Sequence, residues 1–206
     1  MVDKTTDNKL CILSIYKPNY LTQYHIRQMA NLMKKSHVTL LPHLKALEKD
    51  AILTQKTIGK NKAYSLNLDN INAKIALLVV EAAESMAYLN KVFIIKSITA
   101  EIAKLNLSGT VILFGSYAKQ TFKEESDIDL FYFGDIMDEE WKKISNFGKI
   151  YGKNINIKKA SKIAFENGLR AKDPLIEEVV KSHILLHNME SFVNSLWKYY
   201  NEIRRQ

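Results

Sequence analysis

The sequence predicts an α+β protein, with helices followed by a hairpin in the N-terminal part and a mixed α/β part completed by helices. Three observations predict this class. Apolar residues recur at helical spacing over residues 9–49, and two β-type segments follow within 51–66. Residues 110–133 contain two apolar, β-type segments on either side of a Gly-Ser turn. Residues 174–203 return to helical spacing and are expected to form two helices.

Three short helices are expected in the first 50 residues. The first ends at the turn signal Lys17-Pro18-Asn19, Thr22 caps the second, and Ser36 caps the third. The third helix is expected to bury an apolar stripe formed by Val38, Leu41, Leu44 and Leu47. Strands are then expected at 51–56 and 63–66, joined by a basic loop that contains Gly59.

Positive charge is concentrated in this N-terminal part. Residues 1–68 contain 11 Lys or Arg and 4 Asp or Glu, a net of +7, whereas the whole chain has a net charge of +8. A local excess of this kind indicates a polyanionic partner for the first third of the chain. A Lys-rich surface that only maintains solubility is the alternative.

The order of helix, helix, turn, helix and hairpin resembles the winged helix-turn-helix domains of prokaryotic transcription regulators over residues 1–68. The resemblance implies that the helix from about Ser36 to Lys49 enters the major groove of double-stranded DNA. The side chains that it places on bases or phosphates are Lys34, Lys35, Thr39, His43, Lys45, Lys60 and Lys62. Winged helices also serve as protein-interaction modules, and that alternative stays open.

Residues 69–92 are expected to form a helical linker. Its apolar positions alternate between steps of four and three residues, which is the spacing of a coiled coil. They are Ile71, Ile75, Leu78, Ala82, Ser85 or Met86, and Leu89. The pattern predicts either the seam of a homodimer or a helix packed on its own domain.

Residues 110–129 contain the motif with the clearest chemistry. Gly115 and Ser116 follow a buried strand, where glycine lets a phosphate approach the backbone and Ser116 adds a hydroxyl at the start of a short helix. Asp127 and Asp129 are two residues apart on the next strand, so both side chains point to the same face. Two converging carboxylates repel each other unless a cation binds between them, which predicts a Mg²⁺ site.

The segment from Leu113 to Leu130, with Gly-Ser, ten residues and then Asp-Ile-Asp, resembles the signature of the DNA polymerase beta-like nucleotidyltransferases. Within that superfamily it is most similar to the minimal nucleotidyltransferases of bacteria and archaea, and the N-terminal winged helix resembles an archaeal fusion. The resemblance implies a nucleotidyltransferase domain over 93–206, with Asp127 and Asp129 as catalytic metal ligands. It also implies that ATP or another nucleoside triphosphate binds at Gly115 and Ser116, with Lys119 near the phosphates.

One residue departs from the family pattern. A third carboxylate is expected from a later strand, Lys153–Lys158, where Asn156 stands instead. An amide oxygen can bind Mg²⁺ but cannot act as a general base. Two functions therefore follow: an enzyme that transfers a nucleoside monophosphate to a protein, RNA or small-molecule acceptor, or a DNA-binding regulator whose nucleotide domain is degenerate.

Other features limit the class of protein. Cys11 is the only cysteine, which excludes an internal disulfide and a cysteine-based zinc cluster. No stretch approaches the roughly 18 apolar residues of a membrane helix, and the first ten residues do not form a signal peptide. The sequence therefore predicts a cytoplasmic protein without a membrane partner. His183 and His187 have the spacing of a two-histidine metal site but are expected to be structural.

Overall fold

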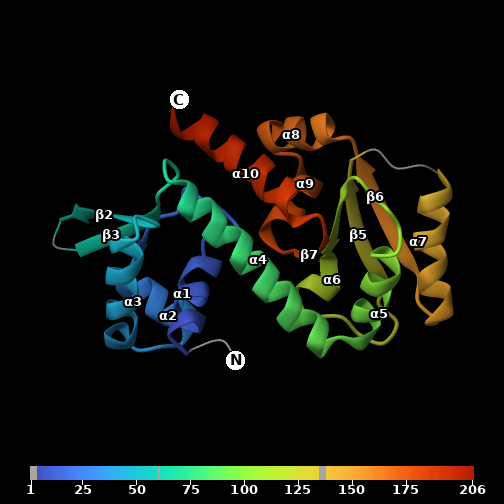
Figure 1. The fold of residues 1–206 in the computed structure, drawn as a ribbon, viewed down its shortest axis with the longest axis horizontal. Helices are drawn as coiled ribbons and strands as arrows, with labels where there is room; N and C mark the ends of the chain where they lie inside the picture. Colours follow the sequence, from blue (N-terminus) through green and yellow to red (C-terminus); the bar gives the residue numbers. More distant parts are fainter. Residues whose placement is uncertain (1–3, 60, 135–137) are drawn as a thin grey trace. The chain divides into compact units, whose positions relative to one another are not determined.

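The computed structural model describes residues 4–59, 61–134 and 138–206 (Figure 1). The protein is α+β and divides into two compact units. Unit 1 comprises Met1–Val80 and Leu196–Gln206, and unit 2 comprises Glu81–Ser195. These units divide the chain at positions that differ from the domain boundaries expected from the sequence, and those boundaries stay a prediction.

Unit 1 contains three helices, a three-stranded antiparallel sheet and the beginning of a long helix. The sheet has the order β1-β3-β2, with β2 and β3 joined as a hairpin. The elements in chain order are α1 (Lys4–Ser14), β1 (Tyr24–His25), α2 (Ile26–Met33), α3 (His37–Lys49), β2 (Leu53–Ile58), β3 (Asn61–Leu66) and α4 (Ile71–Lys91).

The expected start of the third helix is confirmed, and two other local expectations are wrong. Ser36 caps α3, where its side chain accepts a hydrogen bond from the Val38 amide. Thr22 does not cap α2, because Tyr24 and His25 first pair with β3 and His25 becomes the N-cap. The buried stripe of α3 matches the expected set only in part. Leu44 and Leu47 are buried as expected, whereas Val38 and Leu41 are exposed and Leu40 is buried instead.

The end of the chain belongs to unit 1 through two sets of contacts. The rings of Tyr20 and Tyr200 lie 4.9 Å apart between centroids, and both side chains are buried. The guanidinium of Arg204 donates to both carboxylate oxygens of Asp69, at 2.9 and 2.5 Å. This bidentate geometry connects α10 to the loop before α4.

Unit 2 is built around a mixed four-stranded sheet with the order β6-β5-β4-β7. β5 is antiparallel to β4 and parallel to β6, and β4 is antiparallel to β7. Its elements after α4 are α5 (Phe93–Ile102), β4 (Thr110–Phe114), α6 (Gly115–Ala118), β5 (Ile128–Phe133), α7 (Asp138–Ile150), β6 (Ile155–Ala160), α8 (Lys162–Ala171), α9 (Pro174–Lys181), β7 (Ile184–His187) and α10 (Met189–Arg204).

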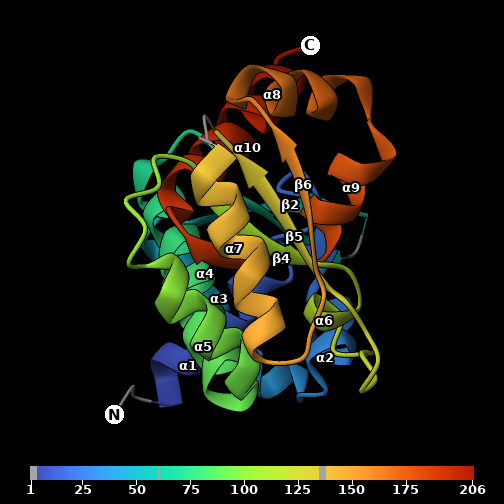
Figure 2. The same cartoon turned by 90° about the vertical axis from the view of Figure 1, so that its right-hand side faces the viewer.

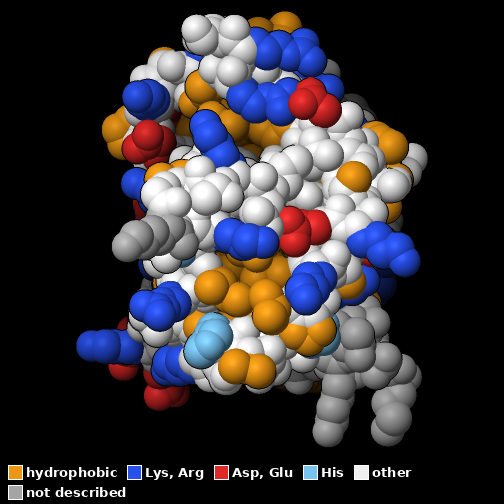
Figure 3. Space-filling view, turned by 90° about the vertical axis from the view of Figure 1, so that its left-hand side faces the viewer, with side chains coloured by type: hydrophobic (Ala, Val, Ile, Leu, Met, Phe, Trp, Pro, Cys, Tyr) orange, Lys and Arg blue, Asp and Glu red, His pale blue; other side chains and the backbone are white. Residues whose placement is uncertain are grey.

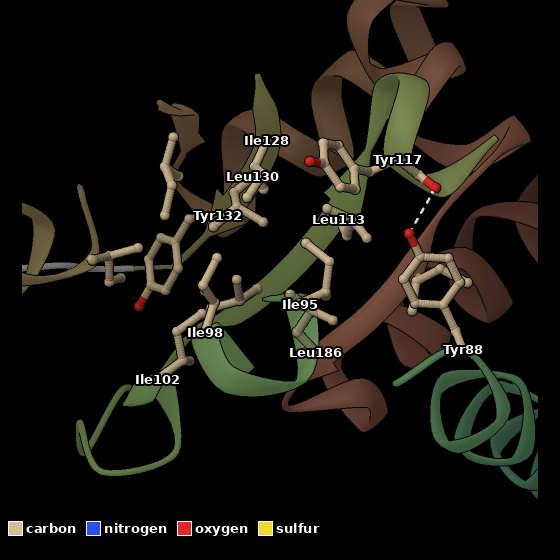
Figure 4. Packing of buried hydrophobic residues seen from close by; sticks show 14 of the residues in the cluster. Tyr88, Ile95, Ile98, Ile102, Leu113, Tyr117, Ile128, Leu130, Tyr132 and Leu186 are labelled. Atoms are coloured by element: carbon tan, nitrogen blue, oxygen red, sulfur yellow. Dashed lines mark hydrogen bonds between the residues drawn. The ribbon is translucent and has the colours of Figure 1, made fainter. Parts of the chain in front are cut away.

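Helices cover both faces of this sheet. Figures 1 and 2 show α5 and α7 against one face, with α8 and α9 on the other. Ile128, Leu130 and Tyr132 of β5 point into the cluster under α5, together with residues of α4 and α6 (Figure 4). The intervening Phe131 and Phe133 pack against Phe165 of α8 on the opposite face.

Several elements of unit 2 were not expected from the sequence. Residues 174–203 do not form two adjacent helices alone, because β7 separates α9 from α10 and completes the sheet at the edge of β4. β7 lies in a segment that was expected to be helical, and α8 lies in a segment to which no element was assigned. Helix α9 begins at Pro174, where helical spacing was expected to begin, and Asp173 caps it.

The helical character expected of residues 69–92 agrees with α4, which spans Ile71–Lys91. Among the positions expected to form a homodimer seam, Ile71, Ile75 and Met86 are exposed, whereas Ser85 is buried. The homodimer stays a prediction. Within the described ranges, no helix is both long enough and apolar enough to span a membrane.

Candidate active site

The Gly-Ser turn lies directly against one of the two aspartates. Phe114, the last residue of β4, pairs with Asp129 of β5, and Gly115 then begins α6. Gly115 has a φ of +67°, and a Cβ at this position would lie 2.4 Å from Asp129 Oδ2. Both the backbone conformation and the contact with the carboxylate therefore require glycine. The adjacent Ser116 is half-buried.

Asp127, Asp129 and Asn156 come together where β5 and β6 run in parallel. Asp129 and Asn156 are partners in the strand register, and Asp127 immediately precedes β5. The Asn156 amide nitrogen lies 3.1 Å from Asp127 Oδ2 and 3.4 Å from Asp129 Oδ1. One partly positive group thus bridges the two carboxylates, which confirms that their side chains face the same place.

The surroundings disfavour charge on Asp129. Burial raises the pKa of the Asp129 carboxyl above its ordinary value, and the neighbouring Asp127 and Glu178 charges raise it further. The hydrogen bond from Asn156 and the charge of Lys158 lower the pKa and oppose these effects. A cation placed beside Asp129 would therefore stabilise its ionised form.

These residues fit a divalent cation with oxygen ligands. Asp127 Oδ2 and Asp129 Oδ1 converge on the Asn156 amide nitrogen, and a rotated amide would present its oxygen to the same place. No cluster of three or more His, Cys, Asp or Glu suitable for a metal occurs in the parts of the chain that the structure describes. The candidate ligand set is therefore two carboxylates and one amide.

Lys119 lies one turn after Gly115, and its ammonium contacts Glu178 of α9. The distance from Lys119 Nζ to Glu178 Oε1 is 2.6 Å, and both side chains are about half exposed. Glu178 was not identified from the sequence, because it stands 49 positions after Asp129 and is one of two adjacent glutamates on α9. Only the packing of α9 on β4 brings it to this site.

The residues of unit 1 that were expected to contact DNA differ in their exposure to solvent. Lys34, Thr39, Lys45 and Lys62 are exposed. His43 is half-buried and its Nε2 lies 3.1 Å from Asn8 Nδ2, so it packs toward α1 rather than outward as expected.

Of the other two residues expected to contact DNA, one is half-buried and one lies outside the described residues. Lys35 is half-buried, and its ammonium also contacts the side chain of Asn8. Lys60 lies outside the described residues.

The two C-terminal histidines each contact buried protein groups from different elements. His183 Nε2 lies 3.0 Å from Glu81 Oε1, and both side chains are buried. His183 Nδ1 contacts the Val180 carbonyl at 3.0 Å and must carry a proton, because a carbonyl oxygen only accepts. His187 Nε2 contacts the Leu107 carbonyl at 2.9 Å. The expectation that both are structural agrees with these contacts.

Comparison with known proteins gives a family for the central part of the chain. Residues 96–191 match the family described as "Polymerase beta, Nucleotidyltransferase". No curated protein matches the chain. A chain from a crystal structure of a toxin–antitoxin with AMP-PNP is similar at 14% identity and a TM-score of 0.35, covering 53% of this chain and 86% of that chain. Residues 96–191 are therefore a nucleotidyltransferase domain of the polymerase beta type.

Proposed function

We propose that this protein is a Mg²⁺-dependent nucleotidyltransferase that moves a nucleoside monophosphate from ATP or another nucleoside triphosphate to an acceptor hydroxyl. The convergence of Asp127 and Asp129 on one point beside the Gly115 turn carries this proposal. The family match over residues 96–191 supports the reaction class.

Each residue of the site has a distinct role in this proposal. Asp127 and Asp129 hold the cation through their carboxylates, and Asn156 adds its amide oxygen. Gly115 and Ser116 would bind and position the triphosphate. A bound cation would neutralise phosphate charge and polarise the phosphorus.

The transfer itself exchanges one phosphorus–oxygen bond for another. The acceptor oxygen forms a bond to the α-phosphorus, the bond from that phosphorus to the β-phosphate oxygen breaks, and pyrophosphate leaves. Asn156 can orient the hydroxyl but cannot take its proton, so the proton passes to water. We therefore expect slow transfer by the native chain.

The direct test is a calorimetric titration of the native chain with ATP, with and without Mg²⁺, followed by transfer assays with α-labelled triphosphates. Mg²⁺-dependent binding and label transfer to a protein, RNA or small-molecule hydroxyl support the proposal. A folded chain that binds no triphosphate in the presence of Mg²⁺ contradicts it.

The Lys119–Glu178 pair predicts a specific effect on nucleotide affinity. Phosphate binding by Lys119 competes with the Glu178 carboxylate, which also adds negative charge near Asp129. Because an exposed ion pair contributes roughly 0.2–1 kcal/mol, Glu178→Gln should tighten Mg-ATP binding by about 1.5- to 5-fold in calorimetry.

Glu177→Gln is the matched control, since Glu177 is the adjacent residue on α9 and lies 3.9 Å from Lys181 instead. This control should leave ATP affinity unchanged, and Lys119→Ala should weaken it. Weaker ATP binding by Glu178→Gln would mean that Glu178 supports the nucleotide rather than competing for Lys119.

We further propose that residues 1–68 form a winged helix that binds double-stranded DNA. Its support is the element order α1-β1-α2-α3-β2-β3 with the sheet order β1-β3-β2, together with the local charge excess. Figure 3 shows Lys and Arg side chains on this side of unit 1, with hydrophobic side chains among them. The exposed Val38 and Leu41 of α3 contribute apolar surface, which keeps the protein-interaction alternative open.

Lys45→Ala combined with Lys62→Ala should weaken DNA binding because both side chains are exposed cations on α3 and β3. If each neutralises one phosphate, the slope of log affinity against log salt should fall by about 1.8 in magnitude. Lys104→Ala in unit 2 is the control, as Lys104 pairs with Glu101. DNA affinity that does not depend on salt would exclude phosphate contacts and favour a protein partner.

A further inference from the structure

Positive charge is concentrated around strand β6 of unit 2. Residues 149–165 contain five lysines and no Asp or Glu. Residues 1–68 account for +7 of the net charge of +8, so the rest of the chain outside 149–165 has a net charge of −4. The five lysines lie at the end of α7, before β6, on β6 and at the start of α8, and they are Lys149, Lys153, Lys158, Lys159 and Lys162.

Strand β6 is an edge strand. The sheet has the order β6-β5-β4-β7, and among the described residues β5 is the only strand that pairs with β6 (Figure 2). Lysines are common at such edges because their charge prevents pairing with another chain. That role is met by a charge on either face of the strand, so it does not explain a cation beside the candidate active site.

Lys158 lies on the face of β6 that carries Asn156. The two residues are two positions apart on the strand, so their side chains point the same way, about 6.6 Å apart. The intervening Ile157 packs against the apolar cluster on the other face. Lys158 is exposed, and no acidic side chain in the described ranges forms an ion pair with it. Its charge lowers the pKa of Asp129, which is consistent with an ammonium near that carboxylate.

The strand order gives the candidate site two sides. Gly115 follows β4, Asp129 is on β5 and Asn156 is on β6, and β5 lies between the other two strands. In the proposed function the triphosphate binds at Gly115 and the acceptor hydroxyl is oriented by Asn156. The acceptor therefore approaches from the β6 side, where Lys158 is the next side chain on the same face.

We propose that the acceptor is the end of a nucleic-acid strand, with its phosphates on the lysines around β6 and its terminal hydroxyl at Asn156. This inference rests on the proposed function and names its acceptor class. A strand carries one negative charge per nucleotide and so complements a series of lysines, whereas a neutral small molecule or a protein hydroxyl does not. Lysines bind phosphates without reading bases, so the terminal sequence should have little effect.

The reaction is then the addition of one nucleotide to the strand. The terminal hydroxyl oxygen forms a bond to the α-phosphorus, the bond from that phosphorus to the β-phosphate oxygen breaks and pyrophosphate leaves. The proton of the hydroxyl passes to water, as in the proposed function. Label from α-labelled ATP should appear on a short RNA or DNA strand with a free 3′-hydroxyl, and not on the same strand ending in a 3′-deoxynucleotide.

Fluorescence anisotropy with short single-stranded RNA and DNA of one sequence tests the binding surface. All measurements use the Lys45→Ala, Lys62→Ala background, so that these cations of unit 1 do not contribute. Adding Lys158→Ala, Lys159→Ala and Lys162→Ala should lower the slope of log affinity against log salt by about 2 in magnitude, if each lysine neutralises one phosphate. The affinity for Mg-ATP, measured by calorimetry, should stay unchanged, because the triphosphate lies on the β4 side.

The matched control removes three exposed lysines from α4, α5 and the turn after α5, namely Lys91→Ala, Lys96→Ala and Lys104→Ala, and should leave the slope unchanged. Lys158→Gln alone keeps the test valid if the triple variant does not fold. Because an exposed ion pair contributes little, this single change should weaken strand binding by about 1.5- to 5-fold, again with native affinity for Mg-ATP.

A chain that binds Mg-ATP but neither strand would overturn the inference and leave the proposed function intact. An equal loss in the control variant would also overturn it, and so would label that appears only on protein. A Lys158→Gln variant that loses affinity for Mg-ATP and for the strand equally would place this lysine on the triphosphate instead. A native chain that binds no Mg-ATP contradicts the proposed function itself.

Discussion

Replacing both Asp127 and Asp129 with Asn is expected to abolish Mg²⁺-dependent ATP binding without unfolding the protein. The cation interaction depends on these two negative charges, and a bound metal contributes several kcal/mol, so affinity should fall by at least about a hundredfold. Asn keeps the shape of each side chain and can still hydrogen-bond to Asn156. Calorimetry with Mg-ATP measures the loss.

The same variant should be at least as stable as the native chain at neutral pH. The pKa of Asp129 is raised in the folded state by burial and by neighbouring negative charges. The folded protein therefore disfavours the ionised form, and this destabilisation is absent at pH values below the unfolded pKa. It grows as pH rises through the folded pKa and stays constant above it. Thermal denaturation without Mg²⁺ should show a higher Tm for the variant at pH 7 and a negligible difference at pH 3.

Glu125→Gln provides the matched control, because Glu125 is an exposed acid two residues before Asp127. It should leave both ATP affinity and the pH dependence of Tm unchanged. ATP binding that survives in the Asp127→Asn, Asp129→Asn variant would place the cation elsewhere. A variant that unfolds at pH 7 would instead show that the carboxylates stabilise the fold.

Asn156→Asp is expected to increase nucleotidyl transfer by about a hundredfold or more, since a positioned general base typically contributes 10²–10⁴-fold. Asn156 pairs with Asp129 in the strand register and contacts both carboxylates. An aspartate at position 156 would therefore place three carboxylates close together. It supplies the proton acceptor that the amide cannot. Pyrophosphate release in the presence of Mg²⁺ and a hydroxyl acceptor measures the gain.

The same substitution should make stability depend on Mg²⁺. In its absence a third carboxylate faces Asp127 and Asp129 and the bridging amide is lost, so Tm should fall below that of the native chain. Mg²⁺ should restore it, because a ligand that binds only the folded state stabilises that state. Asn146→Asp adds the same charge at an exposed position of α7 and should change neither Tm nor turnover.

Two results of this experiment have different meanings. A Mg²⁺-dependent Tm without faster transfer would show that the third acid binds the cation but that proton transfer does not limit the reaction. A Tm that does not change on addition of Mg²⁺ would show that the three side chains do not bind a common cation.

The local sequence was sufficient for the parts of the site that are close together along the chain. The Gly115-Ser116 turn between strands and the Asp127 and Asp129 spacing come from short-range backbone periodicity, and Asn156 was found because its strand alternates apolar and polar residues. The helix start at Ser36 was equally local, because a cap depends on a residue and its next three neighbours.

Expectations failed where a residue could satisfy the same pattern in two ways. Helix α3 carries apolar residues on two faces, so its sequence did not distinguish the buried Leu40 stripe from the exposed Val38 and Leu41. His43 was expected to point outward, and its direction is decided by packing against Asn8 of α1. Residues 184–187 are a short apolar run, which becomes a strand only because the edge of β4 is available to pair.

By itself the sequence indicated the family of the central domain, because the Gly-Ser turn and the Asp-Ile-Asp spacing resemble the polymerase beta-like signature, and the family match over residues 96–191 confirms it. The tertiary structure decided which distant groups surround that site. Glu178 reaches Lys119 because α9 packs on β4. The physical reason is that side-chain direction repeats with the local backbone, whereas contacts between distant segments depend on the packing of the whole core.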